Sequence, residues 1–430
     1  MIQIDKAEQI LSEQNGQRIL TEIYGADGVE RAQARYRTII QGYRKTFRTT
    51  QVSFFSSPGR TEVGGNHTDH NHGKVLAGSI NLDCIGVAGK NGTNLIHIHD
   101  ITYNENLNID VNDLEKSAAD RGSVGLMKGI LTAFRKFGWQ IGGFDACICS
   151  NVIRAAGVSS SASFEMLICA ILNAFFNDGK VDLVTYARAG QYAENVYWEK
   201  ASGLLDQMAC AVGGMIAIDF KNPAEPQVEK IDFDFGAQDY HLIIVNTGKS
   251  HADLNEDYSS IPKEMKSVAG FFGKEVCREI SCDDVLRNLS AVRAKCGDRA
   301  VMRALHFFAE NDRVDAQVEA LKNNDFNRFL SLITASGNSS WKYLQNCYSA
   351  HNVSEQGICV ALAATEAFLA EKNVGACRVH GGGFAGVIAV FVPKCFSEEY
   401  MSYIDGLLGE GSSYKMSIRN HGAIDWGRLL

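Results

Sequence analysis

The sequence predicts a chain of mixed strands and helices, of the α/β or α+β class. Strand-like runs alternate with helix-like runs along most of the 430 residues. The clearest helix is predicted at 161–176, where apolar residues recur at helical spacing along one face. A composition with 45% apolar and 21% charged residues is typical of a globular protein with a sizeable core.

The remaining elements follow from the same patterns. Apolar runs predict strands at 79–90, 144–152, 213–220, 240–248 and 386–393, and further helices are predicted at 181–200 and 354–372. A basic-sided helix before residue 50 is interpreted as a solvated face. Two prolines between strand-like runs, within 221–230, indicate a boundary that divides the chain into domains 1–220 and 221–430.

Charge and cysteine usage exclude several functions. The net charge is −8 with no basic run, so we expect no nucleic-acid partner. No apolar run approaches the ~20 residues of a membrane span, and the first residues do not resemble a signal peptide. The twelve cysteines occur without a C-x-x-C pair, which favours a reducing, cytoplasmic location.

A histidine-rich stretch, GGNHTDHNHG at 64–73, raises the question of a metal site. It contains three imidazoles and a carboxylate, but their order, H-x-D-H-x-H, differs from the H-x-H-x-D-H of metallohydrolases. A second pair, at 97 and 99, is interpreted as packed or surface histidines on a strand. The stretch is therefore better explained by another kind of binding site.

Four further features carry chemistry. At 56–60 a predicted Pro-Gly turn leads to Arg60, and at 155–163 the loop AAGVSSSAS runs into the predicted helix. Small residues before a helix N-terminus suit phosphate binding, although a serine-rich N-cap explains them equally well. Asp206 lies among apolar residues, and the triple glycine at 381–383 leads into a strand, where a permissive turn is the simpler reading.

In combination these stretches resemble the GHMP sugar kinases and, among them, the galactokinase family. SPGRTEVGGNHTDHNHGKVL is similar to the sugar-binding signature, and AAGVSSSAS to the phosphate-binding loop. AENVYWEKASGLLDQM resembles the segment with the metal-binding glutamate and the catalytic aspartate. RVHGGGFAGVIAVFV resembles the glycine-rich third motif. The motifs occur in family order from residue 58 to about 392.

The resemblance implies a role for each matching residue. Arg60 and Asp206 are expected at the catalytic centre, with Arg60 stabilising the transferring phosphoryl group and Asp206 facing the sugar C1 hydroxyl. The expected sugar-binding residues are Asn66, His67, Asp69, Gly203, Asp206, Tyr258 and Gly382. The expected ATP-binding residues are Gly157, Ser159, Ser160 and Ser161, and Ser160 and Glu194 are expected to hold Mg²⁺.

The implied function is ATP-dependent phosphorylation of galactose at C1, with ATP as co-substrate and Mg²⁺ as cofactor. The implied fold is α+β with two domains, an N-terminal one like ribosomal protein S5 and a ferredoxin-like C-terminal one, and the active site between them. We expect a monomer whose partners are a small sugar and MgATP. Nucleic acid, membrane and protein partners are not expected.

The chain departs from the family pattern at three places. Asn66 replaces a glutamate expected to accept a hydrogen bond from the sugar C6 hydroxyl. The segment 153–156 replaces a proline and glycines in the phosphate loop, and His380 and Ala385 replace a threonine and a glycine. Three alternatives therefore stay open: a 1-kinase for N-acetylgalactosamine, arabinose or a uronic acid, a non-catalytic sugar sensor on the same fold, and a metallohydrolase.

Overall fold

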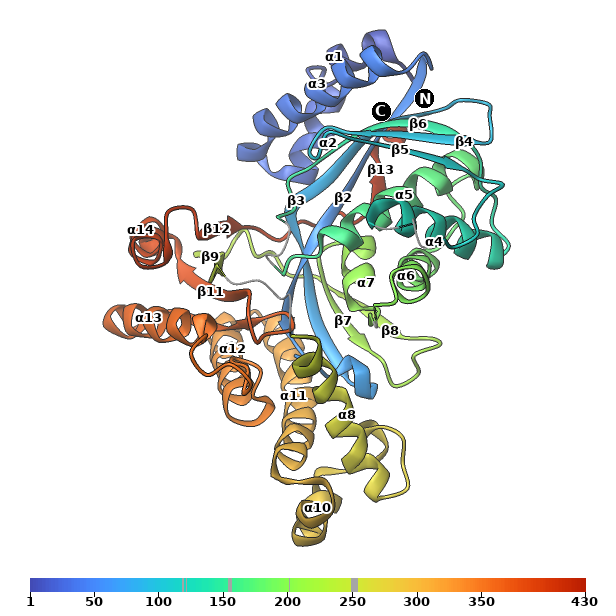
Figure 1. The fold of residues 1–430 in the computed structure, drawn as a ribbon. Coiled ribbons are helices and arrows are strands. Elements are labelled where there is room, and N and C mark those ends of the chain that lie inside the picture. Colours follow the sequence, from blue (N-terminus) through green and yellow to red (C-terminus); the bar gives the residue numbers. More distant parts are fainter. Residues whose placement is uncertain (118–119, 121, 154–156, 201, 249–253) are drawn as a thin grey trace.

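Two β-sheets and the helices around them form the molecule, and the long strands β2 and β3 run through its middle (Figure 1). The computed structural model describes all residues except 118–119, 121, 154–156, 201 and 249–253. Mixed strands and helices confirm the predicted α+β class. Within the described residues, no helix has the length and apolar character needed to cross a bilayer.

The first sheet has the order β1-β2-β3-β6-β4-β5. In addition, β13 pairs with β2, β7 pairs with the other end of β3, and β8 pairs with β7. All its pairs are antiparallel except β4 with β6. The strands are β1 (Ile2–Gln3), β2 (Gln51–Gly64), β3 (Lys74–Lys90), β4 (Leu95–Asp100), β5 (Glu105–Asp110), β6 (Phe144–Ser150), β7 (Met215–Asp219), β8 (Gln227–Ile231) and β13 (Ile424–Asp425).

Helices cover both faces of this sheet because successive strand residues point to opposite sides. Phe54 packs toward the N-terminal helices, whereas its neighbour Phe55 packs into the core beneath the central helices. The N-terminal helices are α1 (Ala7–Ile10), α2 (Gln14–Tyr24) and α3 (Val29–Thr46). The central helices are α4 (Gly122–Lys136), α5 (Ser160–Phe176), α6 (Leu183–Tyr192) and α7 (Leu205–Val212).

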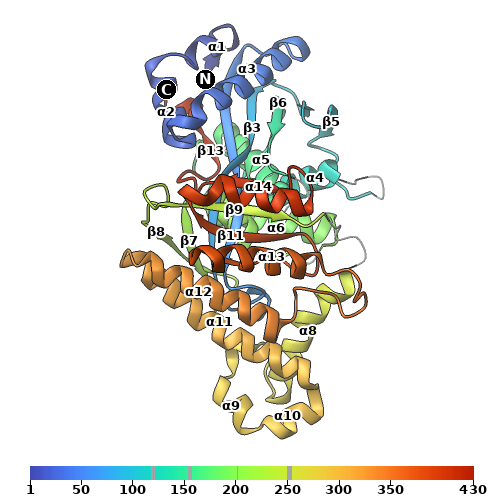
Figure 2. The same cartoon turned by 90° about the vertical axis from the view of Figure 1, so that its left-hand side faces the viewer.

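The second sheet has the antiparallel order β10-β11-β9-β12. Helices α13 and α14 cover one of its faces (Figure 2), and residues of α11 and α12 share a core with the other. The strands are β9 (Tyr240–Asn246), β10 (Ala376–His380), β11 (Val387–Pro393) and β12 (Ser413–Met416). The helices are α8 (Asn255–Phe271), α9 (Cys282–Arg287), α10 (Leu289–Cys296), α11 (Asp298–Lys322), α12 (Phe326–Ser339), α13 (Gly357–Lys372) and α14 (Ser397–Leu408).

Most of the predicted elements coincide with observed ones. The strands predicted from apolar runs correspond to β3, β6, β7, β9 and β11, and the predicted helices correspond to α5, α6 and α13. The run at 181–200 departs from an α-helix at its end, since a π-helical turn occupies Ala193–Tyr197. The division at residue 220 stays a prediction. Strand β8 lies beyond it yet pairs with β7, and β13 returns to β2.

Two sequence interpretations are wrong. Pro58 and Gly59 form no turn but lie inside β2, where the register with β3 shifts. At this irregularity, Arg60 N donates a hydrogen bond to the carbonyl of Val158 in the serine loop, residues 157–161. The basic helix α3 is not wholly a solvated face either. Its Arg35 forms a 2.5 Å ion pair with Asp83, a fully buried residue of β3.

Candidate active site

A cavity where β2, α7 and the β10–β11 loop meet collects most of the predicted site residues. Its lining includes Arg60, His67, Asp69, Glu194, Gly203, Asp206, Tyr258, Gly381 and Gly382. These residues come from segments separated by up to 322 positions, so only the tertiary fold brings them together. The predicted residues Asn66, Gly157, Ser159, Ser160 and Ser161 do not line this cavity.

An ion pair between Arg60 and Asp206 lies at the centre of the site. Arg60 Nε donates to Asp206 Oδ1 at 2.8 Å, and Ser159 Oγ donates to Asp206 Oδ2 at 2.6 Å. Burial alone would raise the pKa of Asp206, but the Arg60 charge and the Ser159 hydroxyl outweigh it, so the pKa lies below its usual value. Asp206 is therefore ionised at neutral pH, as an acceptor for a hydroxyl proton must be.

The serine loop surrounds this pair at the start of α5. Gly157 accepts a hydrogen bond from Arg60 through its carbonyl and has a positive φ of 64°. Ser159 also has a left-handed φ, of 60°, which turns the chain into the helix. The N-terminus of a 17-residue helix carries a partial positive charge suited to phosphate. The neighbouring residues 154–156, a predicted departure from the family, lie outside the described residues.

Glu194 links the serine loop to a lysine that sequence reasoning missed. Its Oε1 accepts hydrogen bonds from Ser161 Oγ at 2.8 Å and from Lys200 Nζ at 3.0 Å. The Glu194 side chain is 2% exposed, whereas that of Lys200 is 54% exposed. A second cavity, lined by Ser160 and Ser161 together with Phe164 and Trp198 among others, adjoins this group.

The first cavity also contains the predicted sugar-contacting side chains. His67 Nε2 donates to the Gly382 carbonyl at 2.7 Å, and burial lowers the pKa of His67 to about 4, so the ring is neutral at pH 7. Gly203 and Gly382 leave necessary space. A Cβ at Gly203 would overlap the Asp69 carboxylate, and one at Gly382 would overlap the Tyr258 ring.

Asn66 does not contribute its side chain to the cavity. The residue is fully buried, and its amide is hydrogen-bonded on both sides within the protein. Glu62, four residues earlier on β2, lines the cavity instead. The alternation of strand side chains offered a signal for this, because Arg60 and Glu62 are two residues apart and share a strand face.

The structure gives no support to a metal-binding histidine cluster. Among the described residues, no group of three or more histidine, cysteine, aspartate or glutamate side chains is arranged to hold a metal ion. His97 is hydrogen-bonded to Asp145 and His99 to Asn106, as expected for a packed or surface pair on a strand. The metallohydrolase alternative therefore has no geometric basis in the described part of the chain.

Comparisons with known proteins agree with this geometry. Residues 41–90 match the family model of the galactokinase galactose-binding signature, and residues 125–214 match that of the GHMP kinase N-terminal domain. A galactokinase of Clostridium tetani is 28% identical over 343 residues, which cover 79% of this chain and 84% of the relative. A galactokinase of Limosilactobacillus reuteri is 27% identical over 394 residues, with coverages of 89% and 96%.

Solved structures show the same fold. The galactokinase of Lactococcus lactis, crystallised with galactose, has a TM-score of 0.74 at 24% identity and covers 90% of this chain and 98% of its own. A mevalonate kinase has a TM-score of 0.60 at 16% identity, with coverages of 86% and 99%. The fold is that of the GHMP kinases, and residues 125–214 match their N-terminal domain. Within that class, the chain is similar to galactokinases over most of its length, and its galactose-binding signature matches their family model.

Proposed function

We propose that the protein transfers the γ-phosphoryl group of ATP to the C1 hydroxyl of galactose. The observation that carries this proposal is the Arg60–Asp206 pair, which lines the cavity together with the predicted sugar-binding residues and is hydrogen-bonded to Ser159 at the N-terminus of α5. Phosphoryl transfer depends on positioning and charge stabilisation rather than covalent catalysis. A buried arginine and an ionised carboxylate supply both requirements.

In this proposal Asp206 orients the C1 hydroxyl and accepts its proton as the bond to phosphorus forms. Arg60 donates to the phosphoryl oxygens, where negative charge concentrates during transfer. His67, Asp69 and the backbone around Gly203 and Gly382 hold the sugar, because paired donors and acceptors suit a molecule rich in hydroxyls.

ATP is the co-substrate of the kinase class, and two cavities separated by Ser161 and Glu194 suit its binding. We propose that the adenine enters the second cavity, where Phe164 and Trp198 offer apolar surface, while Ser160 lies between it and the phosphates. Apolar walls with a few polar groups are typical of such ligand sites. The Arg60–Asp206 pair would then lie between the nucleotide and the sugar.

Glu194 and Ser160 would hold Mg²⁺. One buried carboxylate and nearby serine hydroxyls fit this ion, which is usually bound by one or two carboxylates together with substrate phosphates. When bound, the ion would neutralise charge on the ATP phosphates. Lys200, which pairs with Glu194 in this structure, has an exposed side chain free to move to a phosphate instead.

Two further assignments concern the oligomeric state and the cellular location. We propose a monomer, because residues of a single chain line the whole described cavity. We also propose a cytoplasmic location, because all twelve cysteines are free thiols. Size-exclusion chromatography with light scattering tests the first assignment.

The test of the proposed function is ADP release with MgATP over a panel of galactose, N-acetylgalactosamine, arabinose, glucose and galacturonate. The expected result is the highest kcat/KM for galactose and a product phosphorylated at C1. A clear preference for another sugar would correct the substrate. Binding of ATP and galactose without any turnover would overturn the kinase proposal in favour of a sensor.

A further inference from the structure

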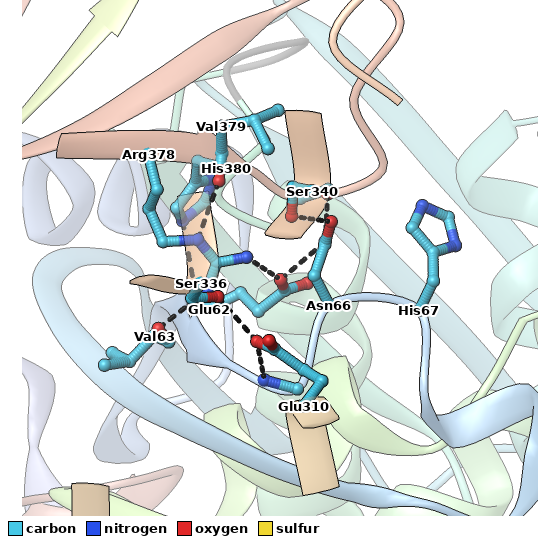
Figure 3. A network of polar contacts seen from close by, with 12 residues as sticks. Glu62, Val63, Asn66, His67, Glu310, Ser336, Ser340, Arg378, Val379 and His380 are labelled. Carbon is cyan, nitrogen blue, oxygen red and sulfur yellow. Dashed lines mark hydrogen bonds and ion pairs between the residues drawn. The ribbon is translucent and has the colours of Figure 1, made fainter. Parts of the chain in front are cut away.

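A buried polar network lies directly behind the sugar cavity and involves residues that the proposed mechanism does not use (Figure 3). Glu62 and Asn66, from β2 and the turn after it, meet Arg378 of β10 there. Figure 3 shows the Glu62 carboxylate between the Arg378 guanidinium and the Asn66 amide, with His67 pointing away from this group. The network decides which polar atoms remain for a ligand.

The Asn66 amide has no hydrogen-bonding capacity left. Its Nδ2 donates to Glu62 Oε1 at 2.8 Å and to the Gly381 carbonyl at 2.7 Å. Its Oδ1 accepts from Asn346 Nδ2 at 2.8 Å and from Ser340 Oγ at 3.3 Å. A primary amide offers two donors and two acceptor sites, so all four are used. The residue is also fully buried, and a sugar hydroxyl cannot reach it.

The Arg378 guanidinium also bonds within the protein. It donates from Nε to the Val379 carbonyl at 3.0 Å, from Nη1 to the Val63 carbonyl at 2.7 Å and from Nη2 to Glu62 Oε1 at 3.1 Å. The side chain is 1% exposed. Arg378 therefore compensates the charge of Glu62 without being accessible to a ligand.

Glu62 differs from both neighbours because one of its oxygens remains available. Oε1 accepts the bonds from Asn66 and Arg378, whereas no described residue donates a hydrogen bond to Oε2. The side chain keeps 10% exposure and lines the sugar cavity. An acceptor left unpaired in a nearly buried site is costly unless a ligand or water donates to it.

We infer that Glu62 Oε2 accepts a hydrogen bond from a sugar hydroxyl remote from C1 and so determines substrate specificity, in place of the predicted Asn66. This inference rests on the proposed function for the direction of the sugar in the cavity. Arg60 and Glu62 are two strand residues apart, a span of about 6.6 Å. A pyranose ring with its C1 hydroxyl at Asp206 therefore presents its far side to Glu62.

The same geometry defines the substrate class. A carboxylate acceptor at this position selects a sugar with a hydroxyl there, because a sugar without it leaves Glu62 desolvated and unpaired. Arg378 is 1% exposed and already pairs with Glu62, so a uronic acid would place its carboxylate beside those of Glu62 and Asp69 without charge compensation from Arg378. The site thus favours a neutral hexose.

The test compares sugar affinity between hydroxyl-deleted ligands and a Glu62 variant. Calorimetry without ATP gives Kd for galactose and for its 2-, 3-, 4- and 6-deoxy analogues. In the wild type, one analogue should bind about 10- to 100-fold more weakly than galactose, as expected for loss of a hydrogen bond to a charged group. In Glu62→Gln, the loss of affinity for that analogue relative to galactose (its deoxy penalty) should fall to a few-fold, while the deoxy penalties of the other three analogues stay unchanged.

Glu310→Gln is the matched control. Glu310 is a fully buried glutamate of the same region that accepts from Gly65 N and Ser336 Oγ but does not line the cavity. Its substitution should leave every deoxy penalty as in the wild type. Glu62→Asp, which keeps the charge but withdraws the carboxylate by one methylene, should show the same selective loss if Glu62→Gln does not fold.

Two results would overturn the inference: equal deoxy penalties in the wild type and in both Glu62 variants, or no binding of any of these sugars by the wild type. Failure of the kinase proposal is a separate outcome. If the wild type binds galactose and the selective loss occurs, but MgATP yields no sugar phosphate, the role of Glu62 stands and the proposed reaction falls.

Discussion

Asp206→Asn is the substitution that most directly tests the catalytic centre. Asparagine keeps the size of the side chain and an oxygen that can accept from Arg60 Nε, which now lies 2.8 Å away. In the wild type, Ser159 Oγ donates to Asp206 Oδ2 at 2.6 Å. In the variant an amide nitrogen replaces Oδ2, and this nitrogen can donate to the Ser159 hydroxyl instead. The substitution thus removes a negative charge and a proton acceptor with little change in shape.

The expected loss follows from these contacts. A positioned general base contributes about 10²- to 10⁴-fold to a rate, so kcat should fall by that factor. Galactose affinity should change only a few-fold, because the groups of His67 and Asp69 remain. Breaking a fully buried ion pair costs about 3–5 kcal/mol, but Asp206 is 34% exposed and solvent screens the remaining Arg60 charge. We therefore expect a loss of roughly 1–2 kcal/mol in the free energy of unfolding.

The assay is initial-rate ADP release with MgATP and galactose, with calorimetric galactose binding and urea unfolding of the same preparation. The reasoning predicts a protein that is folded and binds sugar but turns over slowly. A kcat within threefold of the wild type would refute the role of Asp206 in positioning or deprotonating the hydroxyl.

Three further substitutions test other parts of the structure. Asp83→Asn leaves the fully buried Arg419 without its 2.9 Å partner and should lower the unfolding free energy at pH 7 by about 3–5 kcal/mol in urea titrations. Burial by itself would raise the pKa of Asp83, but its ion pairs lower that pKa in the folded protein. The stability that Asp83 contributes is therefore fully present above its pKa in the unfolded chain and is lost as the pH falls through its pKa in the folded protein. The difference between variant and wild type should therefore shrink in acid, and a constant difference would contradict this account. Gly203→Ala places a methyl group against Asp69 and should raise KM for galactose about tenfold with a smaller effect on kcat; an unchanged KM would show that the sugar does not depend on this contact. Glu194→Gln should raise the Mg²⁺ concentration for half-maximal rate by about 10- to 100-fold, measured at saturating galactose, and an unchanged Mg²⁺ dependence would place the ion elsewhere.

Local sequence patterns predicted most of the secondary structure. The strands β3, β6, β7, β9 and β11 and the helix α5 each carry an apolar pattern long enough to indicate the element without its neighbours. The patterns failed where long-range packing overrides a local preference. Pro58 and Gly59 read as a turn, yet β3 pairs with the strand on both sides of them, and the irregular register absorbs the missing donor.

Charged residues were harder to place for the same reason. The basic face of α3 has no sequence feature that separates Arg35 from the solvated residues around it. Arg35 is drawn inward because Asp83 lies buried on the facing strand, 48 positions away. A buried carboxylate without cations would be strongly unfavourable, so the tertiary pair determines the position of both side chains.

The sequence by itself determined the class of chemistry, because the residue types for phosphoryl transfer lie in short motifs whose local geometry is nearly autonomous. A small-residue loop before a helix binds anions wherever it occurs. The tertiary structure alone decided which side chain lines the cavity. Asn66 is turned inward by Asn346 and by Gly381, 280 and 315 positions later in the chain, and that leaves Glu62 at the cavity. The donors and acceptors of a buried side chain are paired with residues that are close in space but distant in the sequence, so no local sequence pattern identifies those partners.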